Sequence, residues 1–133
     1  MNKVMNWIKF SASTAMLALS VSVFHQPTNA QRPSTFATSC TDISISGAQL
    51  SATCIKKNGS NQRTSITIRG IHNRNGQLVQ STIREASTFN RTCTGISISG
   101  DQLSASCRTG NGENQQSSVT LLGINNSDGN LTY

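Results

Sequence analysis

Side chains able to perform acid–base or nucleophilic chemistry are few and scattered in this sequence. After residue 30 there is a single histidine, His72, and the carboxylates lie at Asp42, Glu85, Asp101, Glu113 and Asp128. Glycoside hydrolysis uses two carboxyl groups that flank one bond, and α/β-hydrolases carry a G-x-S-x-G nucleophile motif. The sequence offers neither a recurrent carboxyl pair nor that motif. We therefore predict a binding protein rather than an enzyme, with His72 at the surface.

The four cysteines have a spacing that favours structural disulfides over metal or redox chemistry. Thirteen residues separate Cys40 from Cys54, and thirteen separate Cys93 from Cys107. Zinc sites use closely spaced cysteines or histidine partners, and dithiol redox sites use C-x-x-C, and neither pattern occurs. We expect no bound metal and no cofactor. Four cysteines allow three disulfide pairings, and the repeat described next favours Cys40–Cys54 with Cys93–Cys107.

The elements that carry these cysteines occur twice. Residues 35–80 align with residues 88–133 at a constant offset of 53 without a gap, and 25 of the 46 pairs are identical. Solenoid architectures need at least three copies of a repeat. Two copies instead predict one pseudo-twofold domain with two equivalent faces, in which residues 81–87 link the repeats.

Each copy has the pattern of short β-strands. ISIS, at 43–46 and again at 96–99, alternates apolar and hydroxyl residues, which is typical of strands with one buried face. Asn75-Gly76 and Asp128-Gly129 are hairpin-turn signals. No helix of three turns is predicted, although the linker STIREAS is compatible with one helical turn, and the two phenylalanines of the repeats are assigned to the core. The predicted fold class is all-β.

The first thirty residues have the layout of a secretory signal peptide. Lys3 and Lys9 precede an uncharged apolar run, residues 10–24, and small residues end at Ala30. This order is typical of an export signal, and the apolar run is shorter than a bilayer requires. We expect residues 1–30 to be removed, no membrane span, and a secreted domain of residues 31–133, extracellular or, in a Gram-negative bacterium, periplasmic. Such compartments are oxidising, as disulfides require.

The charge of the remaining chain is mildly basic. Residues 31–133 contain nine Lys or Arg and five Asp or Glu, so their net charge is 9 − 5 = +4. Proteins that bind single-stranded nucleic acid combine such charges with stacking aromatics. Only Phe36, Phe89 and Tyr133 remain here. We therefore expect no nucleic-acid partner.

Together these motifs resemble the cyanovirin-N homology family. The resemblance is carried by Cys-x₁₃-Cys in two tandem copies, the phenylalanine before each copy, the I-x-G…L-x-A-x-C segment and the closing D-G-x-L-x-Y, and it covers residues 35–133. It implies an elongated, pseudo-symmetric domain with two disulfides, in which strands of the other repeat complete each half. It also implies a metal-free lectin for α1-2-linked mannose, either a monomer or a domain-swapped dimer, whose partners are oligomannose glycans or glycoproteins.

The resemblance further implies two carbohydrate-binding sites. The first combines the N-terminal segment, the residues after the second cysteine and the last turn, namely Thr38, Ser39, Lys56, Lys57, Asn126, Ser127 and Asp128. The second combines the equivalent segments of the other half, namely Arg91, Thr92, Arg108, Thr109, Asn73, Arg74 and Asn75. Metal-free recognition of sugar hydroxyls needs such clustered donors and acceptors.

A second class of function stays open on the sequence alone. A structural or adhesion module of the same fold would bind another glycan or a protein surface. This reading is favoured by Ile55, Asn73 and Arg91, which stand where the family often has Glu, whereas Arg108-Thr109 and the turn residues favour the lectin.

Overall fold

The computed structural model describes residues 32–133, and in this range it contains β-hairpins and two short 3-10 helices, which confirms the all-β fold class. The predicted signal peptide, residues 1–30, lies outside the described residues. The elements follow in the order η3 (Phe36–Thr38), β1 (Cys40–Ser46), β2 (Gln49–Ile55), β3 (Asn61–Thr67), β4 (Ile71–Arg74), β5 (Gln77–Gln80), η4 (Phe89–Arg91), β6 (Cys93–Ser99), β7 (Gln102–Arg108), β8 (Asn114–Thr120), β9 (Asn125–Ser127) and β10 (Asn130–Thr132).

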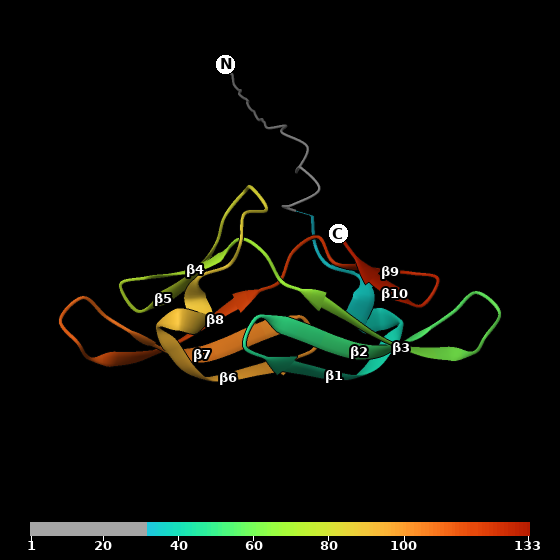
Figure 1. The fold of residues 1–133 in the computed structure, drawn as a ribbon, viewed down its shortest axis with the longest axis horizontal. Helices are drawn as coiled ribbons and strands as arrows, with labels where there is room; N and C mark the ends of the chain where they lie inside the picture. Colours follow the sequence, from blue (N-terminus) through green and yellow to red (C-terminus); the bar gives the residue numbers. More distant parts are fainter. Residues whose placement is uncertain (1–31) are drawn as a thin grey trace, which may run out of the picture.

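The domain is elongated, with two similar halves arranged along its length (Figure 1). Each half is built on a three-stranded antiparallel sheet, in the order β1-β2-β3 or β6-β7-β8. The short hairpin that completes each half comes from the other repeat, because β10 packs on β2 and β3 while β5 packs on β7 and β8. Each half therefore joins segments that are far apart in the sequence.

The core follows from the alternation of the strands. In β2 the residues Leu50, Ala52 and Cys54 are fully buried, while the residues between them face outwards. Phe36 and Phe89 are also fully buried, as the sequence predicts. Burying an apolar side chain of this size stabilises a fold by about 1.5–3 kcal/mol.

Both predicted disulfides are present. Cys40 bonds to Cys54, and Cys93 bonds to Cys107, each across directly opposed residues of neighbouring strands. Each bond closes a loop with a sequence separation of 14 residues. In the chain-entropy account, closing a loop of that length stabilises the fold by roughly 3 kcal/mol.

A serine hydroxyl holds the junction where the chain crosses from one half to the other. The Ser87 hydroxyl donates to the Ile68 carbonyl at 2.8 Å and accepts the Ile71 N–H at 3.0 Å. Ser34, which stands 53 residues earlier, makes the equivalent pair of bonds at the junction before β9, at 2.7 and 3.0 Å. These two links fix the hairpins of the halves to the sheets on which they pack.

The linker, residues 81–87, is not helical, so the single turn compatible with its sequence does not form. Its backbone runs beside the connection between β3 and β4. The Gly70 N–H donates to the Glu85 carbonyl at 2.8 Å, and Arg69 forms an antiparallel bridge with Ala86. In a helical turn the backbone groups of the linker would hydrogen-bond to one another. Here they bond instead to the neighbouring segment.

Candidate functional site

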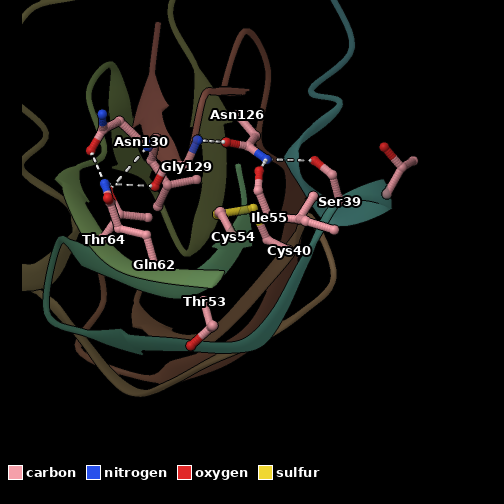
Figure 2. The surroundings of a disulfide bond; sticks show 12 residues. Ser39, Cys40, Thr53, Cys54, Ile55, Gln62, Thr64, Asn126, Gly129 and Asn130 are labelled. Carbon is pink, nitrogen blue, oxygen red and sulfur yellow. Dashed lines mark hydrogen bonds between the residues drawn. A yellow bond between two sulfur atoms is a disulfide. The ribbon is translucent and has the colours of Figure 1, made fainter. Parts of the chain in front are cut away.

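In the first half, the amide side chain of Asn126 links the turn between β9 and β10 to the end of β2 by hydrogen bonds. The Asn126 Nδ2 donates to the Ser39 hydroxyl at 3.0 Å and to the Ile55 carbonyl at 2.9 Å, and its Oδ1 accepts the Gly129 N–H at 2.7 Å. Figure 2 shows this side chain beside the disulfide that joins β1 to β2. Because an amide nitrogen carries two hydrogens and both are used here, Asn126 acts mainly to position the turn.

The second half repeats this arrangement with Asn73. Its Nδ2 donates to the Thr92 hydroxyl and to the Arg108 carbonyl, both at 2.9 Å, and its Oδ1 accepts the Gly76 N–H at 2.7 Å. The turn between β4 and β5 is thereby held against the end of β7. The two predicted asparagines thus hold the two turns in the same way.

The turn residue two positions later makes a further link in each half. The Asp128 carboxylate accepts the Lys57 N–H at 2.9 Å, and the Asn75 amide oxygen accepts the Gly110 N–H at 2.7 Å. Asp128 and Asn75 have positive φ angles of 47° and 50°, a conformation that Asp and Asn tolerate better than most residues. One carboxylate oxygen of Asp128 and the amide nitrogen of Asn75 point to no protein partner within residues 32–133.

The remaining residues predicted for the first site surround this turn. Lys56 lies so close to the turn that a Cβ added at Gly129 would be 2.7 Å from its Cγ. Ser127 is exposed. Thr38 lies beside the site, but its hydroxyl donates to the Thr35 carbonyl at 2.7 Å inside η3. The structure therefore brings all seven predicted residues into one neighbourhood, and most of the exposed polar groups are at Lys57, Ser127 and Asp128.

In the second half, the seven predicted residues belong to the turns and to a pocket beside them, and Asn73 bonds to two of the pocket residues. The turn face holds Asn73, Arg74 and Asn75, and the Thr109 hydroxyl is used inside the turn between β7 and β8, where it donates to the Asn111 amide oxygen. The other three residues, Arg91, Thr92 and Arg108, line the adjoining pocket.

That pocket has a volume of about 410 Å³ and is lined by Arg91, Thr92, Thr94, Arg108 and Asn114. Thr94 and Arg108 each follow a buried cysteine, so their side chains point to the sheet face opposite the core. Arg108 and Asn114 are directly opposed across β7 and β8. The sequence reasoning missed Thr94 and Asn114; the available signal was the period-2 alternation, which places Thr94 and Arg108 on one face.

His72 is partly buried, with 26% of its side chain exposed, and it is hydrogen-bonded to another side chain, so it is less exposed than the sequence predicts. Its Nδ1 lies 2.6 Å from the Thr88 hydroxyl, and its Nε2 lies 3.3 Å from a Glu85 carboxylate oxygen. In the other half, a Thr35 hydroxyl donates to the Asn125 amide oxygen at 2.6 Å in the equivalent place. Because an amide serves there as well as an imidazole, we interpret this contact as a structural link.

The carboxyl group of this link titrates below its ordinary range. The pKa of Glu85 is lowered chiefly by a backbone hydrogen bond at Glu85 itself, with smaller contributions from the Ser81 hydroxyl and from His72, while desolvation acts in the opposite direction. Glu85 is therefore ionised at neutral pH and available to the imidazole.

The described part of the chain has no cluster of metal-ligating side chains and no membrane-spanning helix. Within residues 32–133, no three His, Cys, Asp or Glu side chains gather as a metal site would require. In the same range, no helix is long and apolar enough to cross a membrane.

Comparison with known proteins assigns the family. The model of the CVNH domain matches residues 36–132. The chain therefore belongs to the CVNH family, as the resemblance to cyanovirin-N homologues indicates. No curated protein matches the chain in sequence.

Solved structures share the fold at low sequence identity. The MoCVNH-LysM module from the rice blast fungus Magnaporthe oryzae is 18% identical with a TM-score of 0.67, covering 77% of this chain and 98% of that one. A MoCVNH3 variant in complex with (N-GlcNAc)4 is 19% identical with a TM-score of 0.63, covering 75% and 97%. Microvirin in complex with mannobiose is 26% identical with a TM-score of 0.58, covering 75% and 97%.

Proposed function

We propose that this protein is a secreted lectin that binds α1-2-linked mannose on high-mannose glycans through two metal-free sites, one in each half. The observation that carries the proposal is the repeated turn site. In both halves an asparagine at the same repeat position, Asn73 or Asn126, holds a hairpin turn against the residue that follows the second cysteine of a repeat.

The chemistry of these sites suits sugar hydroxyls. Each hydroxyl of a sugar both donates and accepts, so a site needs donors and acceptors fixed a few ångströms apart. The first site offers the Lys57 ammonium group, the Ser127 hydroxyl and the second carboxylate oxygen of Asp128. The second offers the Asn75 amide nitrogen and the Arg74 guanidinium group. Because the asparagines hold the turns in place, binding would order few additional groups.

The relatives support carbohydrate as the ligand class. Microvirin was solved with mannobiose, and the MoCVNH3 variant was solved with an N-acetylglucosamine tetramer. We choose mannose because the microvirin sequence is the more similar of these two to this chain. Two sites on one body would raise the avidity for a branched glycan by about 10²–10⁴ if both engage.

The disulfides support secretion. Two disulfides in a chain of this size are typical of an oxidising compartment. Together with the signal-like residues 1–30, they support export of the protein to the cell exterior or to a periplasm.

Calorimetric titration of the exported, oxidised protein with α1-2-mannobiose tests the proposal. We expect saturation at a stoichiometry near two per chain, with no heat from galactose. A stoichiometry near one would restrict the function to a single half. An N-acetylglucosamine tetramer serves as the competing ligand, and preference for it would replace mannose with that sugar. A folded, fully oxidised sample that binds no sugar would refute the lectin and favour the adhesion module.

A further inference from the structure

The pocket on the outer face of β6, β7 and β8 differs from an ordinary neutral sugar site in its charge. Two of its five lining residues, Arg91 and Arg108, carry guanidinium groups, and none of the five carries a carboxylate. Within residues 32–133 the only contact of salt-bridge length between a basic side chain and a carboxylate is between His72 and Glu85. Neither arginine is therefore paired with a carboxylate of the described chain, and Glu113, which precedes β8, does not line the pocket.

Two guanidinium groups beside neutral polar groups form a receptor for an oxyanion attached to a polyol. Guanidinium presents paired N–H donors that match both oxygens of a carboxylate or two oxygens of a sulfate. Thr92, Thr94 and Asn114 supply hydroxyl and amide groups for neighbouring sugar hydroxyls. The Thr92 oxygen already accepts the Asn73 amide, so its own O–H is left to donate.

The first half lacks this charge at the equivalent positions. Subtracting the offset of 53 places Thr38 at the position of Arg91 and Ile55 at the position of Arg108. Ile55 is 47% exposed and cannot bond to an anion. The nearby Arg63 spans the β1 bulge, where its Nη1 donates to the Asp42 carbonyl at 2.9 Å. At the two equivalent positions the first half therefore has no charge, and its lysines, Lys56 and Lys57, lie instead at the turn site.

We infer that the second half binds an acidic sugar, whose carboxylate or sulfate lies between Arg91 and Arg108 while its hydroxyls contact Thr92, Thr94 and Asn114. The first half has no such specificity. This inference rests on the proposed lectin function and adds an anion-binding pocket to the second half alone. Both turn sites would still hold mannose, and only the second half would also hold an anionic unit.

Titration with matched charged and neutral sugars tests the inference. The probes are trigalacturonate, the neutral α1-4-linked galactotriose, a sulfated galactose and inorganic sulfate. We expect trigalacturonate or the sulfated sugar to bind one site per chain, at least on the order of 10-fold more tightly than galactotriose, because hydrogen bonds to charged groups are the stronger ones. The preference should shrink as salt is raised from 20 to 300 mM. The two acidic probes distinguish a uronate from a sulfate ligand.

Variants that exchange the pocket residues of one repeat for those of the other test which residues bind the acidic sugar. Arg91→Thr with Arg108→Ile installs the residues of the first half and should weaken acidic-sugar binding on the order of 10- to 100-fold. Thr38→Arg with Ile55→Arg should create a second acidic-sugar site. Arg32→Thr, an exposed position outside the pocket, controls for net charge. The melting temperature of each variant checks that the fold is retained.

The outcomes separate the two proposals. If mannobiose binds but trigalacturonate and the sulfated sugar bind no better than galactotriose, the acidic-sugar inference is refuted and the lectin stands. If Arg32→Thr weakens acidic-sugar binding as much as the double exchange, the pocket is also refuted as the site. If the acidic sugars bind and mannobiose does not, the pocket is supported and the mannose specificity fails. Binding of inorganic sulfate as tight as that of the sulfated sugar would overturn the role given to Thr92, Thr94 and Asn114.

Discussion

Replacing Asn126 with alanine tests whether one side chain positions the first turn. The change removes three hydrogen bonds, at 3.0, 2.9 and 2.7 Å, to the Ser39 hydroxyl, the Ile55 carbonyl and the Gly129 N–H. A typical hydrogen bond contributes about 1 kcal/mol net, so the expected loss is about 3 kcal/mol. For a domain of this size that loss lowers the melting temperature by about 12–24 °C.

The measurement is urea unfolding of the oxidised protein, with calorimetry for the melting temperature. Ser127→Ala, at an exposed position of the same turn, is the matched control and should change stability by less than about 0.5 kcal/mol. Asn126→Asp should be at least as harmful as the alanine variant, because a carboxylate keeps the Gly129 contact but places an oxygen against the Ile55 carbonyl. Mannobiose binding in the first half should weaken even where the variant is folded.

The second half supplies an independent check. Asn73→Ala removes the equivalent three bonds and should cost the same within about 1 kcal/mol. If either alanine variant unfolds at the same urea concentration as the parent protein, the asparagine does not hold its turn, and the reasoning behind both sites is wrong.

Three further changes test the frame around the sites. Replacing Cys93 and Cys107 together by serine removes a disulfide between residues 14 apart in sequence. The free energy of unfolding measured in urea should fall by roughly 3 kcal/mol. An unchanged urea midpoint would contradict this. Gly76→Ala should be more destabilising than Gly112→Ala in thermal melts. Both glycines have φ near 90°, but of the two only Gly76 would place the new Cβ 2.7 Å from a neighbouring side chain. Equal losses of melting temperature would contradict that packing. Because the folded-state pKa of Glu85 lies below its ordinary value, the carboxylate contributes stability above that ordinary value, and the contribution is lost as the pH falls through the folded-state pKa. Glu85→Gln should therefore be less stable than the parent near neutral pH and equal to it in strong acid, and a pH-independent difference between the two would count against this.

Much of the fold was predictable because its signals are local. Alternating ISIS segments predict half-buried strands, Asn75-Gly76 predicts the β4–β5 turn, and the repeat predicts the disulfide pairing; the structure confirms each of these. The exchange of hairpins between halves was expected only from the family resemblance. Nothing local specifies it, because it depends on which surfaces meet after both sheets have formed.

The linker and His72 show why local reasoning fails elsewhere. Residues 81–87 have the composition of a helical turn, yet Glu85 and Ala86 bond to the segment around Gly70, so tertiary contacts override propensity. His72 has no histidine counterpart in the second repeat, which suggested a surface position. Its partners Thr88 and Glu85 lie more than ten residues away, and only the fold brings them together.

Comparing the two repeats distinguishes the residues that maintain the fold from those that would contact a ligand. The asparagines that hold the turns are identical in both copies and make the same bonds. Ser34 and Ser87 each stand one residue before a copy and also make the same bonds. Three of the five pocket positions differ between the copies although the backbone around them is equivalent. Thr92 corresponds to Ser39 and keeps its hydroxyl, whereas the charges of Arg91 and Arg108 have no counterpart. A difference confined to exposed side chains on a shared frame changes what a surface binds without changing how it folds. This is the physical reason for expecting two ligand specificities from one repeated unit, and for testing them by exchanging residues between the copies.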